Sequence, residues 1–449
     1  MEKTICAIST PIGVGGISVI RLSGKQSLDI VNKILEKPLN NPEPRKMQLK
    51  TIKTKDFCDN CLVVYFKAPF SYTGEDIVEI QCHGGIFITN LILQALLNNG
   101  ANLAENGEFT KRAFLNGKLS LDKAEGVIDM INAESESQLK AGYNLLKGKL
   151  YETIKQKQNV LTDIMAELEV SLDYPEHDIE YTTLENFKQK IENLLSEIVE
   201  IKDTSKTGMI IKNGINIALL GAPNVGKSSL MNSLLGFNRA IVTSIAGTTR
   251  DIIEEGYVFN GVKVNLIDTA GIRESSNQVE QIGINLAKEK LISADLILFV
   301  LDATRKITDE EINLYNSISN KKIIVINKSD IKNECFDLSK LSTNNVKIVE
   351  TSTILNTNID KLKQTIFDEI IGNNIVGNST IITNIRHKNS LEKAENSLKD
   401  ALKTLNDTQS LELLSIDLAN AYSALGEITG ETNSENVIDR IFEKFCLGK

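Results

Sequence analysis

The segment Gly221–Ser228 places two glycines, a lysine and a hydroxyl residue at the spacing GxxxxGK[ST]. The glycines allow successive backbone N–H groups to curl around phosphate oxygens, and a helix that begins there directs its positive end at the same anion. The ammonium of Lys227 then reaches the β- and γ-phosphates, and the hydroxyl of Ser228 is a ligand for Mg²⁺. The apolar run Ile215–Leu220 precedes the motif, as the strand before such a loop must. A glycine turn followed by a chance Lys-Ser pair is the alternative.

Two further segments offer groups for the metal ion and the γ-phosphate. Asp268–Gly271 reads DTAG and follows the apolar run Val264–Ile267. A carboxylate at this strand end can hold Mg²⁺ through water, and the glycine N–H can contact the γ-phosphate. Thr248 and Thr249 lie between the two motifs, where a threonine hydroxyl completes the Mg²⁺ shell only while GTP is bound. Taken singly, a strand-to-loop turn and a threonine-rich loop remain the alternatives.

A third motif has the residues that recognise a guanine base. Asn327–Asp330 matches NKxD and follows the apolar run Ile323–Ile326. The Asp330 carboxylate can accept hydrogen bonds from both N1–H and the exocyclic amine of guanine. Adenine lacks this pair of donors and would leave the carboxylate desolvated and unpaired. Three such motifs in this order, each at the end of an apolar run, predict a GTPase.

The residues that would assist hydrolysis are less obvious. In Ras-like proteins a glutamine directly after DxxG orients the attacking water, and Ile272 holds that position here. Glu274 and Glu280 follow in the same loop, and either carboxylate could orient water. The chain shows no obvious arginine finger. Asn224 and the loop around Thr243 offer oxygen ligands for a monovalent cation that would supply the missing charge.

A parallel sheet is needed to bring these motifs together. Apolar runs at Ile215–Leu220, Val264–Ile267, Leu296–Leu301 and Ile323–Ile326 alternate with helical segments, a pattern typical of buried parallel strands in right-handed βαβ units. Helical patterns bracket this region: one runs from Leu119 to about Lys206, and another follows Asn374. Their apolar spacing is seen in the stripe Leu161, Ile164, Met165, Leu168 and Leu172.

The predicted fold is therefore multidomain, with α+β and α/β parts. Residues 1–118, with short apolar runs such as Ile17–Ile20 and Cys61–Phe66 between glycines and prolines, predict an N-terminal α+β domain. Residues 119–212 and 375–449 predict the two parts of one all-α helical domain. Residues 213–374 predict a Ras-like P-loop GTPase domain inserted between them, since domain termini often lie close together.

Composition excludes some classes of function. The chain has 449 residues and a formal charge of −9, which disfavours non-specific binding to nucleic acid. No apolar run reaches the roughly 18 residues of a membrane span, and the first residues lack the features of a signal peptide. We expect a cytoplasmic protein with no membrane partner. The cysteines are scattered, and the lone pair Cys58 and Cys61 has no matching second pair for a zinc site.

Several segments outside the nucleotide motifs resemble the tRNA-modification GTPase family known as MnmE or TrmE. They are Thr10–Ile17 (TPIGVGGI), Ser71–Asp76 (SYTGED), His83–Gly85, Gly107–Lys118 (GEFTKRAFLNGK) and the terminal Cys446–Lys449, which resembles the family's C-[ILV]-G-K ending. The resemblance covers essentially the whole chain. One departure lies at Thr351–Thr353, where the family's guanine-contacting loop reads Ser-Ala-Lys or similar.

The resemblance implies a function with several partners. The family forms homodimers through the N-terminal domain and a heterotetramer with an FAD-dependent subunit. Together they place a carboxymethylaminomethyl or aminomethyl group on C5 of the wobble uridine of certain tRNAs. 5-Formyltetrahydrofolate or a related reduced folate supplies the one-carbon unit. GTP is the substrate of the hydrolysis, with Mg²⁺ and K⁺ as cofactors.

The resemblance also assigns residues. Folate would bind at Arg21, Glu79, Lys118 and Lys449, where lysine and arginine suit the anionic glutamate tail and glutamate suits the amine edge of the pterin. Mg²⁺ would bind Ser228 and Thr249, and K⁺ would bind Asn224, Thr243, Ile245 (through its carbonyl) and Thr248. Catalytic roles fall to Lys227, Glu280, Arg273 and Cys446. GTP would contact Asn224, Val225, Gly226, Lys227, Ser228, Ser229, Thr243, Ser244, Ile245, Ala246, Gly247, Thr248, Thr249, Asp268, Thr269, Ala270, Gly271, Asn327, Lys328, Ser329, Asp330, Ser352 and Thr353.

Two other classes of GTPase were weighed. A regulatory, ribosome-associated switch calls for a KH-type or lysine-rich RNA-binding segment after the GTPase domain, but the sequence after Asn374 is helical without such a block. A membrane-remodelling GTPase calls for a basic amphipathic helix, and we find none. The tRNA-modification reading is favoured over both.

Overall fold

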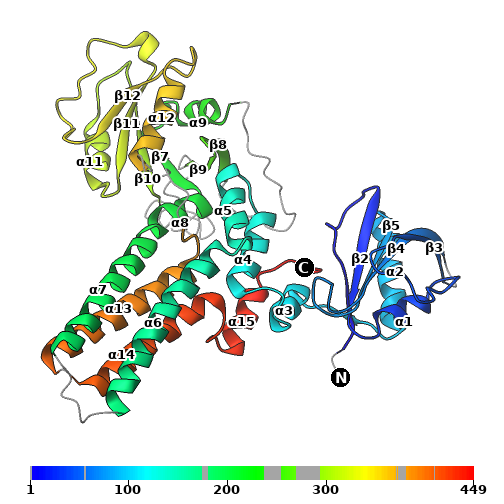
Figure 1. Cartoon of the computed structure of the whole chain (residues 1–449). Helices are drawn as coiled ribbons and strands as arrows, with labels where there is room; N and C mark the ends of the chain where they lie inside the picture. The colour runs from blue at the N-terminus through cyan, green and yellow to red at the C-terminus, as the bar shows by residue number, and fades with distance from the viewer. Residues whose placement is uncertain are drawn as a thin grey trace, which may run out of the picture. The chain divides into compact units, whose positions relative to one another are not determined.

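The computed structural model of the chain describes residues 3–54, 57–173, 181–236, 254–268, 294–370, 372, 381–408 and 410–449. The chain forms two compact units, each assembled from segments that are distant in sequence (Figure 1). The first contains Met1–Ile128, Leu145–Leu194 and Lys393–Lys449, and the second contains Asp129–Asn144 and Leu195–Glu392.

The first unit contains a six-stranded sheet in the order β3-β4-β5-β2-β1-β6. Its strands are β1 (Ile5–Ile8), β2 (Ile17–Ser23), β3 (Gln48–Lys53), β4 (Cys58–Phe66), β5 (Ile77–His83) and β6 (Asn102–Leu103). All neighbours are antiparallel except β1 and β6. Helices α1 (Ser27–Asn32) and α2 (Ile86–Asn98) pack on one face, around a core that includes Ile20, Val78 and Ile92. The α+β prediction is confirmed.

Helices make up the rest of the first unit. α3 (Glu108–Leu115), α6 (Lys149–Asp173), α14 (Leu411–Thr429) and α15 (Glu435–Phe442) lie within it, and α6 and α14 run side by side (Figure 1). Four helices have residues in both units: α4 (Leu121–Ile131), α5 (Glu136–Leu146), α7 (Tyr181–Asp203) and α13 (Ile385–Asp407). The predicted stripe on α6 is buried at Leu161, Ile164 and Leu168, but Leu172 is 36% exposed because it lies at the end of the helix. None of the described helices is long and apolar enough to cross a bilayer.

The second unit holds a six-stranded sheet in the order β12-β11-β10-β7-β9-β8. Its strands are β7 (Ile215–Leu220), β8 (Glu254–Phe259), β9 (Val262–Asp268), β10 (Leu296–Asp302), β11 (Lys322–Asn327) and β12 (Lys347–Glu350). Only the pair β8–β9 is antiparallel. All seven residues of β10 are buried, as expected for a strand covered on both faces. The four predicted parallel strands are confirmed.

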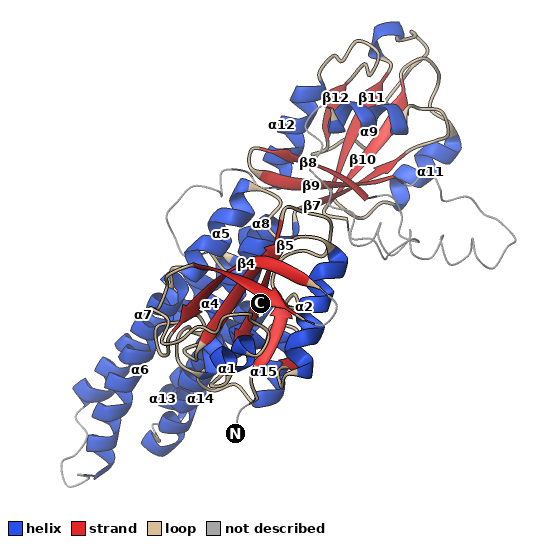
Figure 2. Cartoon of the chain, turned by 90° about the vertical axis from the view of Figure 1, so that its right-hand side faces the viewer, coloured by secondary structure: helices blue, strands red, loops and turns tan. Residues whose placement is uncertain are grey.

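Helices cover both faces of this sheet (Figure 2). α9 (Lys227–Leu235) and α12 (Ile359–Ile370) share one core with the sheet, through residues such as Leu230 and Leu362. α11 (Asp309–Ser317) joins the core on the other face through Tyr315, which packs edge-on against Phe299. Parallel strands end at the same edge of a sheet, so the last residues of β7, β9, β10 and β11 lie along one edge.

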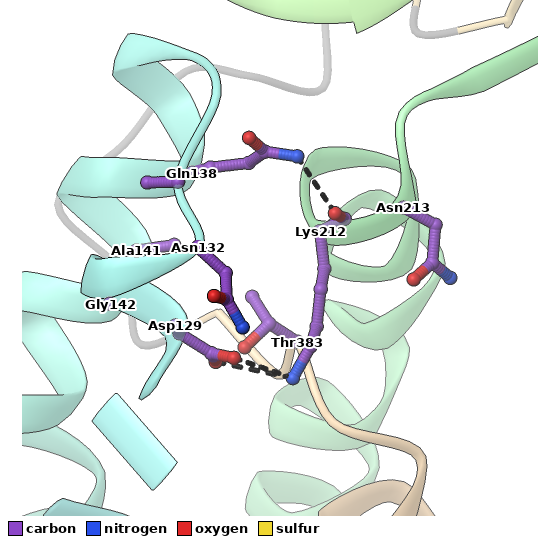
Figure 3. Close-up of a pocket in the computed structure, with 9 residues that line it drawn as sticks. Asp129, Asn132, Gln138, Ala141, Gly142, Lys212, Asn213 and Thr383 are labelled. Carbon is purple, nitrogen blue, oxygen red and sulfur yellow. Dashed lines mark hydrogen bonds and ion pairs between the residues drawn. The ribbon is translucent and has the colours of Figure 1, made fainter. Parts of the chain in front are cut away.

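The segment Asp129–Asn144 belongs to the second unit through polar contacts. Lys212, on α8 (Ser205–Asn213), places its ammonium 2.9 Å from Asp129 Oδ1, and Gln138 donates to the Lys212 carbonyl at 2.9 Å (Figure 3). Ser137 N–H donates to the Gly261 carbonyl at the β8–β9 turn at 3.1 Å. These bonds connect α4 and α5 to the segments that enter β7 and β9.

A pocket of about 180 Å³ remains beside the Lys212–Asp129 pair. The small residues Ala133, Ala141 and Gly142 line it, and the hydroxyl of Thr383 beside it is buried without a hydrogen-bond partner among the residues that the structure describes (Figure 3). The contact between Asp129–Asn144 and α8 is thus polar and incompletely filled, unlike the close-packed cores on either face of the sheet.

Candidate functional site

The loop between β7 and α9 has the backbone of a phosphate cradle. Gly221, Asn224 and Gly226 have positive φ angles of 156°, 63° and 97°, so the chain turns tightly around a point in front of α9. Lys227 is the first residue of α9, and its ammonium donates to the carbonyls of Gly221 and Ala222 at 2.9 Å each. The loop therefore curls around the lysine that is predicted to reach the phosphates.

Glycine is required at two positions of this loop by close packing. A Cβ on Gly226 would lie 2.2 Å from Asn327 Nδ2, and a Cβ on Gly221 would lie 2.3 Å from the Val300 carbonyl. The amide of Asn327 donates to the Val225 carbonyl at 3.0 Å, and both residues are fully buried. The phosphate loop thus packs against β10 and against the start of the NKxD motif.

Replacing Gly226 with Ala is expected to weaken GDP binding by at least about tenfold. The new methyl group collides with Asn327 and meets a positive φ, and relief of the clash moves the loop. Isothermal titration with GDP measures the effect. Gly236→Ala is the matched control, because Gly236 ends the same helix with a φ of 48° but, within the described part of the chain, its Cβ would meet only the Ser233 carbonyl, at 3.8 Å. Equal losses in both variants would show that backbone strain, not the contact with Asn327, decides affinity.

The NKxD motif is tied to the phosphate loop at a second point. Lys328 has a φ of 60°, and its ammonium donates to the Asn224 carbonyl at 3.1 Å and to Asp302 Oδ2 at 2.6 Å. Asp330 lies on the short 3-10 turn Ser329–Ile331 and is exposed, free to face a base. The structure therefore joins Asn224, Val225 and Gly226 to Asn327 and Lys328 at one sheet edge.

Asp302 is a residue of this edge that the motif search missed. It ends β10, and its Oδ1 accepts hydrogen bonds from Thr304 N–H and Oγ–H at 2.9 and 2.7 Å. Burial favours the neutral acid, but the hydrogen bonds from Lys328 and Thr304 outweigh it and lower the pKa of Asp302 below its ordinary value. The sequence did carry a signal for Asp302, because an acidic residue directly follows the apolar run Leu296–Leu301, as Asp268 follows the run Val264–Ile267.

The loop after β12 lies against the NKxD turn. Thr351 N–H donates to the Ile326 carbonyl at 2.8 Å, and the Thr351 carbonyl accepts from Ser329 N–H at 3.1 Å. Ser352 is buried, its N–H donates to the Thr357 carbonyl at 3.3 Å, and Thr353 is half-buried. The loop is therefore held against the NKxD turn by backbone bonds that do not depend on its side chains.

Only some of the other predicted residues of the nucleotide site lie in the described part of the chain. Ser228 and Ser229 lie exposed on the first turn of α9, and Asp268 ends β9. The following predicted residues lie outside the described part of the chain: Thr243, Ser244, Ile245, Ala246, Gly247, Thr248, Thr249, Thr269, Ala270, Gly271, Arg273 and Glu280.

The predicted folate residues lie in the first unit. Arg21 on β2 and Glu79 on β5 are cross-strand neighbours, and their side chains form an ion pair at 2.8 Å, each 18% exposed. The guanidinium also lies 5.6 Å from the ring centre of Tyr72 and 5.7 Å from that of Phe109. This pair is thus fixed by charge on one side and by two aromatic rings on the other.

Lys118 contacts the segment that carries Tyr72. Its ammonium donates to the Pro69 carbonyl at 3.0 Å, and Asn116 donates to the Thr73 carbonyl at 2.7 Å. Tyr72 in turn shares a hydrogen bond of 2.9 Å with Thr110. The residues after β4 therefore connect Lys118 to the surroundings of Arg21.

A buried polar network supports the same segment. Glu75 accepts from Ser23 at 2.6 Å and from Arg112 at 3.1 Å, and Arg112 also pairs with Glu108 at 2.7 Å. Burial alone would lower the pKa of Arg112, but its bonds to Glu108 and Glu75 raise it above its ordinary value. The charged residues of two of the resemblance motifs thus have a structural use, which is to hold the segment around Tyr72 against α3.

The last residues of the chain dock beside β1. Ser9 Oγ donates to the Gly448 carbonyl at 3.1 Å, Leu447 bridges to Asn106, and Gly107 N–H donates to the Cys446 carbonyl at 3.4 Å. Cys446 is exposed as a free thiol, and Lys449 is half-buried. Since β1 pairs with β2 at Ala7 and Arg21, this tail reaches the strand next to the Arg21–Glu79 pair.

Comparison with known proteins covers both ends of the chain. Residues 4–118 match the family described as the GTP-binding protein TrmE N-terminus, and residues 121–446 match the MnmE helical domain. The tRNA modification GTPase MnmE of Clostridioides difficile is 40% identical over 458 residues, with 100% of both chains covered. That of Lactobacillus johnsonii is 42% identical over 453 residues, covering 99% of this chain and 98% of the relative. The FeoB G-domain structure from Methanococcus jannaschii is 28% identical and covers 35% of this chain and 97% of that one, with a TM-score of 0.26. By its full-length relatives and its family matches, the chain belongs to the MnmE (TrmE) family of tRNA modification GTPases.

Proposed function

We propose that this chain hydrolyses GTP to drive the addition of a carboxymethylaminomethyl or aminomethyl group to C5 of the wobble uridine of certain tRNAs. The observation that carries the proposal is the junction at which Asn327 and Lys328 of the base-reading motif bond to the carbonyls of the phosphate loop. A site built this way binds a base and its phosphates as one ligand. Membership of the tRNA-modification family supplies the purpose of the hydrolysis.

Different residues of the chain would hold the phosphates, the base, the metal ion and the attacking water. Lys227 would hold the β- and γ-phosphates, and Asp330 would accept the guanine hydrogen bonds. Ser228, exposed on the first turn of α9, fits as a Mg²⁺ ligand together with Thr249, and Mg²⁺ when bound neutralises phosphate charge. Glu280 would orient the attacking water, with Arg273 in the same loop.

The proposed site includes a monovalent cation beside the phosphate loop. Asn224 supports it, because this residue is exposed on the loop with a φ of 63° and its main-chain carbonyl is held by Lys328. We propose Asn224, Thr243, Ile245 and Thr248 as the K⁺ ligands. K⁺ when bound would supply the positive charge that an arginine finger supplies in other GTPases.

The proposed one-carbon site uses the first unit. Arg21, Lys118 and Lys449 are cations suited to the anionic glutamate tail of 5-formyltetrahydrofolate or a related reduced folate, and Glu79 suits the pterin amine edge. Because Arg21 already pairs with Glu79, the direction in which that carboxylate points is fixed before a ligand arrives. Cys446, exposed on the docked tail, is the proposed reactive thiol.

A homodimer through the N-terminal domain is supported by exposed apolar side chains. Ile12, Val14 and Phe87 are 78%, 91% and 78% exposed. Gly15 N–H donates to the Gly84 carbonyl at 2.9 Å, so the loop that carries Ile12 and Val14 lies beside the residues that lead into α2, whose first turn carries Phe87. Large apolar patches on a protein surface mark contact sites. We propose a second copy of this chain as the contact there, and an FAD-dependent subunit as the further partner in a heterotetramer.

The domains would divide along these functions. We propose that residues 1–118 bind folate and dimerise, residues 119–212 and 375–449 form the helical domain, and residues 213–374 form the GTPase domain. Hydrolysis would change the loops after β7 and β9, and the helical domain would pass that change to the one-carbon site.

Nucleoside analysis of tRNA tests the function directly. In cells that lack this chain, wobble uridines are expected to lose the C5 group, and a plasmid carrying the chain is expected to restore it. Lys227→Ala should fail to restore it, while Lys347→Ala, an exposed lysine on the edge strand β12, should succeed. Unchanged wobble uridines in the deletion strain would reject the proposal.

The cation dependence gives a separate prediction. GTP hydrolysis by the purified chain is expected to be at least about tenfold faster in KCl than in NaCl at equal ionic strength, because the larger cation fits the oxygen cage and supplies transition-state charge. Asn224→Ala is expected to remove the difference. Phosphate release measured in both salts checks this, and equal rates for the unmodified chain would refute K⁺ as the cofactor.

A further inference from the structure

The guanine-recognition motif rests on a buried carboxylate that belongs to none of the GTPase motifs. Asp302 is 8% exposed at its side chain, against 30% for its partner Lys328. One carboxylate oxygen lies 2.6 Å from the Lys328 ammonium, and the other accepts two hydrogen bonds from Thr304. Both oxygens are therefore engaged, and the direction in which Asp302 faces Lys328 is fixed.

Lys328, held by Asp302, also bonds to the phosphate loop. The same ammonium that meets Asp302 donates to the Asn224 carbonyl at 3.1 Å. Asn224 and Lys328 both hold left-handed backbone conformations, with φ angles of 63° and 60°. Asparagine tolerates this conformation, whereas lysine adopts it at a steric cost, and the Lys328–Asn224 bond joins the two turns.

We propose that Asp302 is a positioning residue that sets both the affinity for guanine nucleotides and the K⁺ response of hydrolysis. It orients the Lys328 ammonium, which holds the Asn224 carbonyl and thereby the turn that presents the Asn224 side chain to the cation. This inference rests on the proposed K⁺-dependent GTP hydrolysis. In this proposal Asp302 acts through Lys328, to which it is bound at 2.6 Å.

An asparagine at this position isolates the charge. In Asp302→Asn the side-chain carbonyl can still accept from Thr304, but no anion remains to fix the ammonium of Lys328. A merely structural role predicts lower thermal stability with unchanged ion dependence. A positioning role predicts a changed ion dependence in the folded protein.

The matched control is a substitution at Asp295, next to the opposite end of β10. Asp295 directly precedes β10, and its Oδ2 accepts from Asn216 N–H at 2.8 Å. Asp295→Asn therefore removes an equal charge and weakens one hydrogen bond of the same sheet, away from the edge where the nucleotide motifs meet.

The test measures GDP and ADP affinity by titration, and then GTP hydrolysis against K⁺ concentration with choline holding ionic strength constant. For the full chain carrying Asp302→Asn we expect about tenfold weaker GDP binding and at least about threefold more K⁺ for half-maximal rate. Thr304→Val, which removes one bond to the carboxylate, is expected to give smaller shifts of the same sign and serves if Asp302→Asn does not fold. Asp295→Asn is expected to match the unmodified chain.

The measurements distinguish a failure of the inference about Asp302 from a failure of the proposed function. If the unmodified chain prefers GDP and responds to K⁺ but Asp302→Asn does the same with equal constants, the inference is overturned and the proposed function stands. A weaker GDP affinity with an unchanged K⁺ response would overturn the link through Asn224. If the unmodified chain shows no preference for GDP, the proposed function itself fails.

Discussion

Replacing Asp330 with Asn is expected to lower the affinity for GDP by about 10⁴-fold and to raise the affinity for xanthosine diphosphate. The carboxylate of Asp330 would accept two hydrogen bonds from guanine, and an amide there presents an N–H₂ group to donors instead. Xanthine has a carbonyl where guanine has the amine, so the same amide then finds an acceptor. Competition between the two diphosphates for the purified variant measures the change.

The backbone turn that carries Asp330 is held by neighbouring residues. The turn that carries it is held from both sides, by Lys328 on the phosphate loop and by Ser329 N–H on the Thr351 carbonyl at 3.1 Å. The substitution therefore changes chemistry without loosening the turn. Asp337→Asn is the control: this exposed aspartate accepts from Ser339 at 2.9 and 2.6 Å in the same unit and lies in none of the motifs. A variant at Asp330 that still prefers GDP would remove the base-reading role from this residue.

Replacing Gly448 with Ala is expected to weaken the binding of 5-formyltetrahydrofolate by at least about tenfold while leaving GTP binding unchanged. Gly448 has a φ of 85°, and a Cβ there would lie 2.3 Å from the Ile8 carbonyl and 2.9 Å from the Ser9 Cα. Neither backbone atom can move without disturbing β1, so the tail must lift away. Lys449 and Cys446 would leave with it. Equilibrium dialysis against the folate, with GDP titration on the same sample, measures both affinities.

Gly100→Ala separates tail displacement from backbone strain. Gly100 lies in the same unit with a φ of 108°, but its Cβ would have no atom within 4 Å. This variant is expected to lose some stability and to keep its folate affinity. Should Gly448→Ala bind the folate as tightly as the unmodified chain, the docked tail has no part in the one-carbon site.

The sequence predicted most of the GTPase fold because its strands are buried on both faces. β10 and β11 contain continuous apolar runs of this kind, whereas Asn216 interrupts the run in β7 and Asn265 interrupts the run in β9. β8 and β12 were not predicted. They lie at the two edges of the sheet, where only part of each strand is covered and polar residues such as Lys347 and Glu350 interrupt the apolar pattern.

The candidate site was predictable only where a motif has fixed spacing. Asn327 and Lys328 were found as ligands of the base, but their bonds to Val225 and Asn224 join segments about a hundred residues apart and leave no local signal. Asp302 had a local signal, an acidic residue directly after an apolar run, but its partner Lys328 follows the neighbouring strand β11 and could not be predicted from the sequence. Arg21 and Glu79 were assigned by resemblance alone. Their pairing follows from the register of β2 and β5, which the sequence does not display.

The most direct test of the central claim is competition between GDP and ADP for the purified full-length chain in Mg²⁺, followed by fluorescence of a labelled guanine nucleotide. The account predicts that GDP displaces the label at concentrations at least about 10³-fold lower than ADP does, because only guanine satisfies Asp330 in a loop fixed by Asn327 and Lys328. Displacement by both nucleotides at similar concentrations would contradict it.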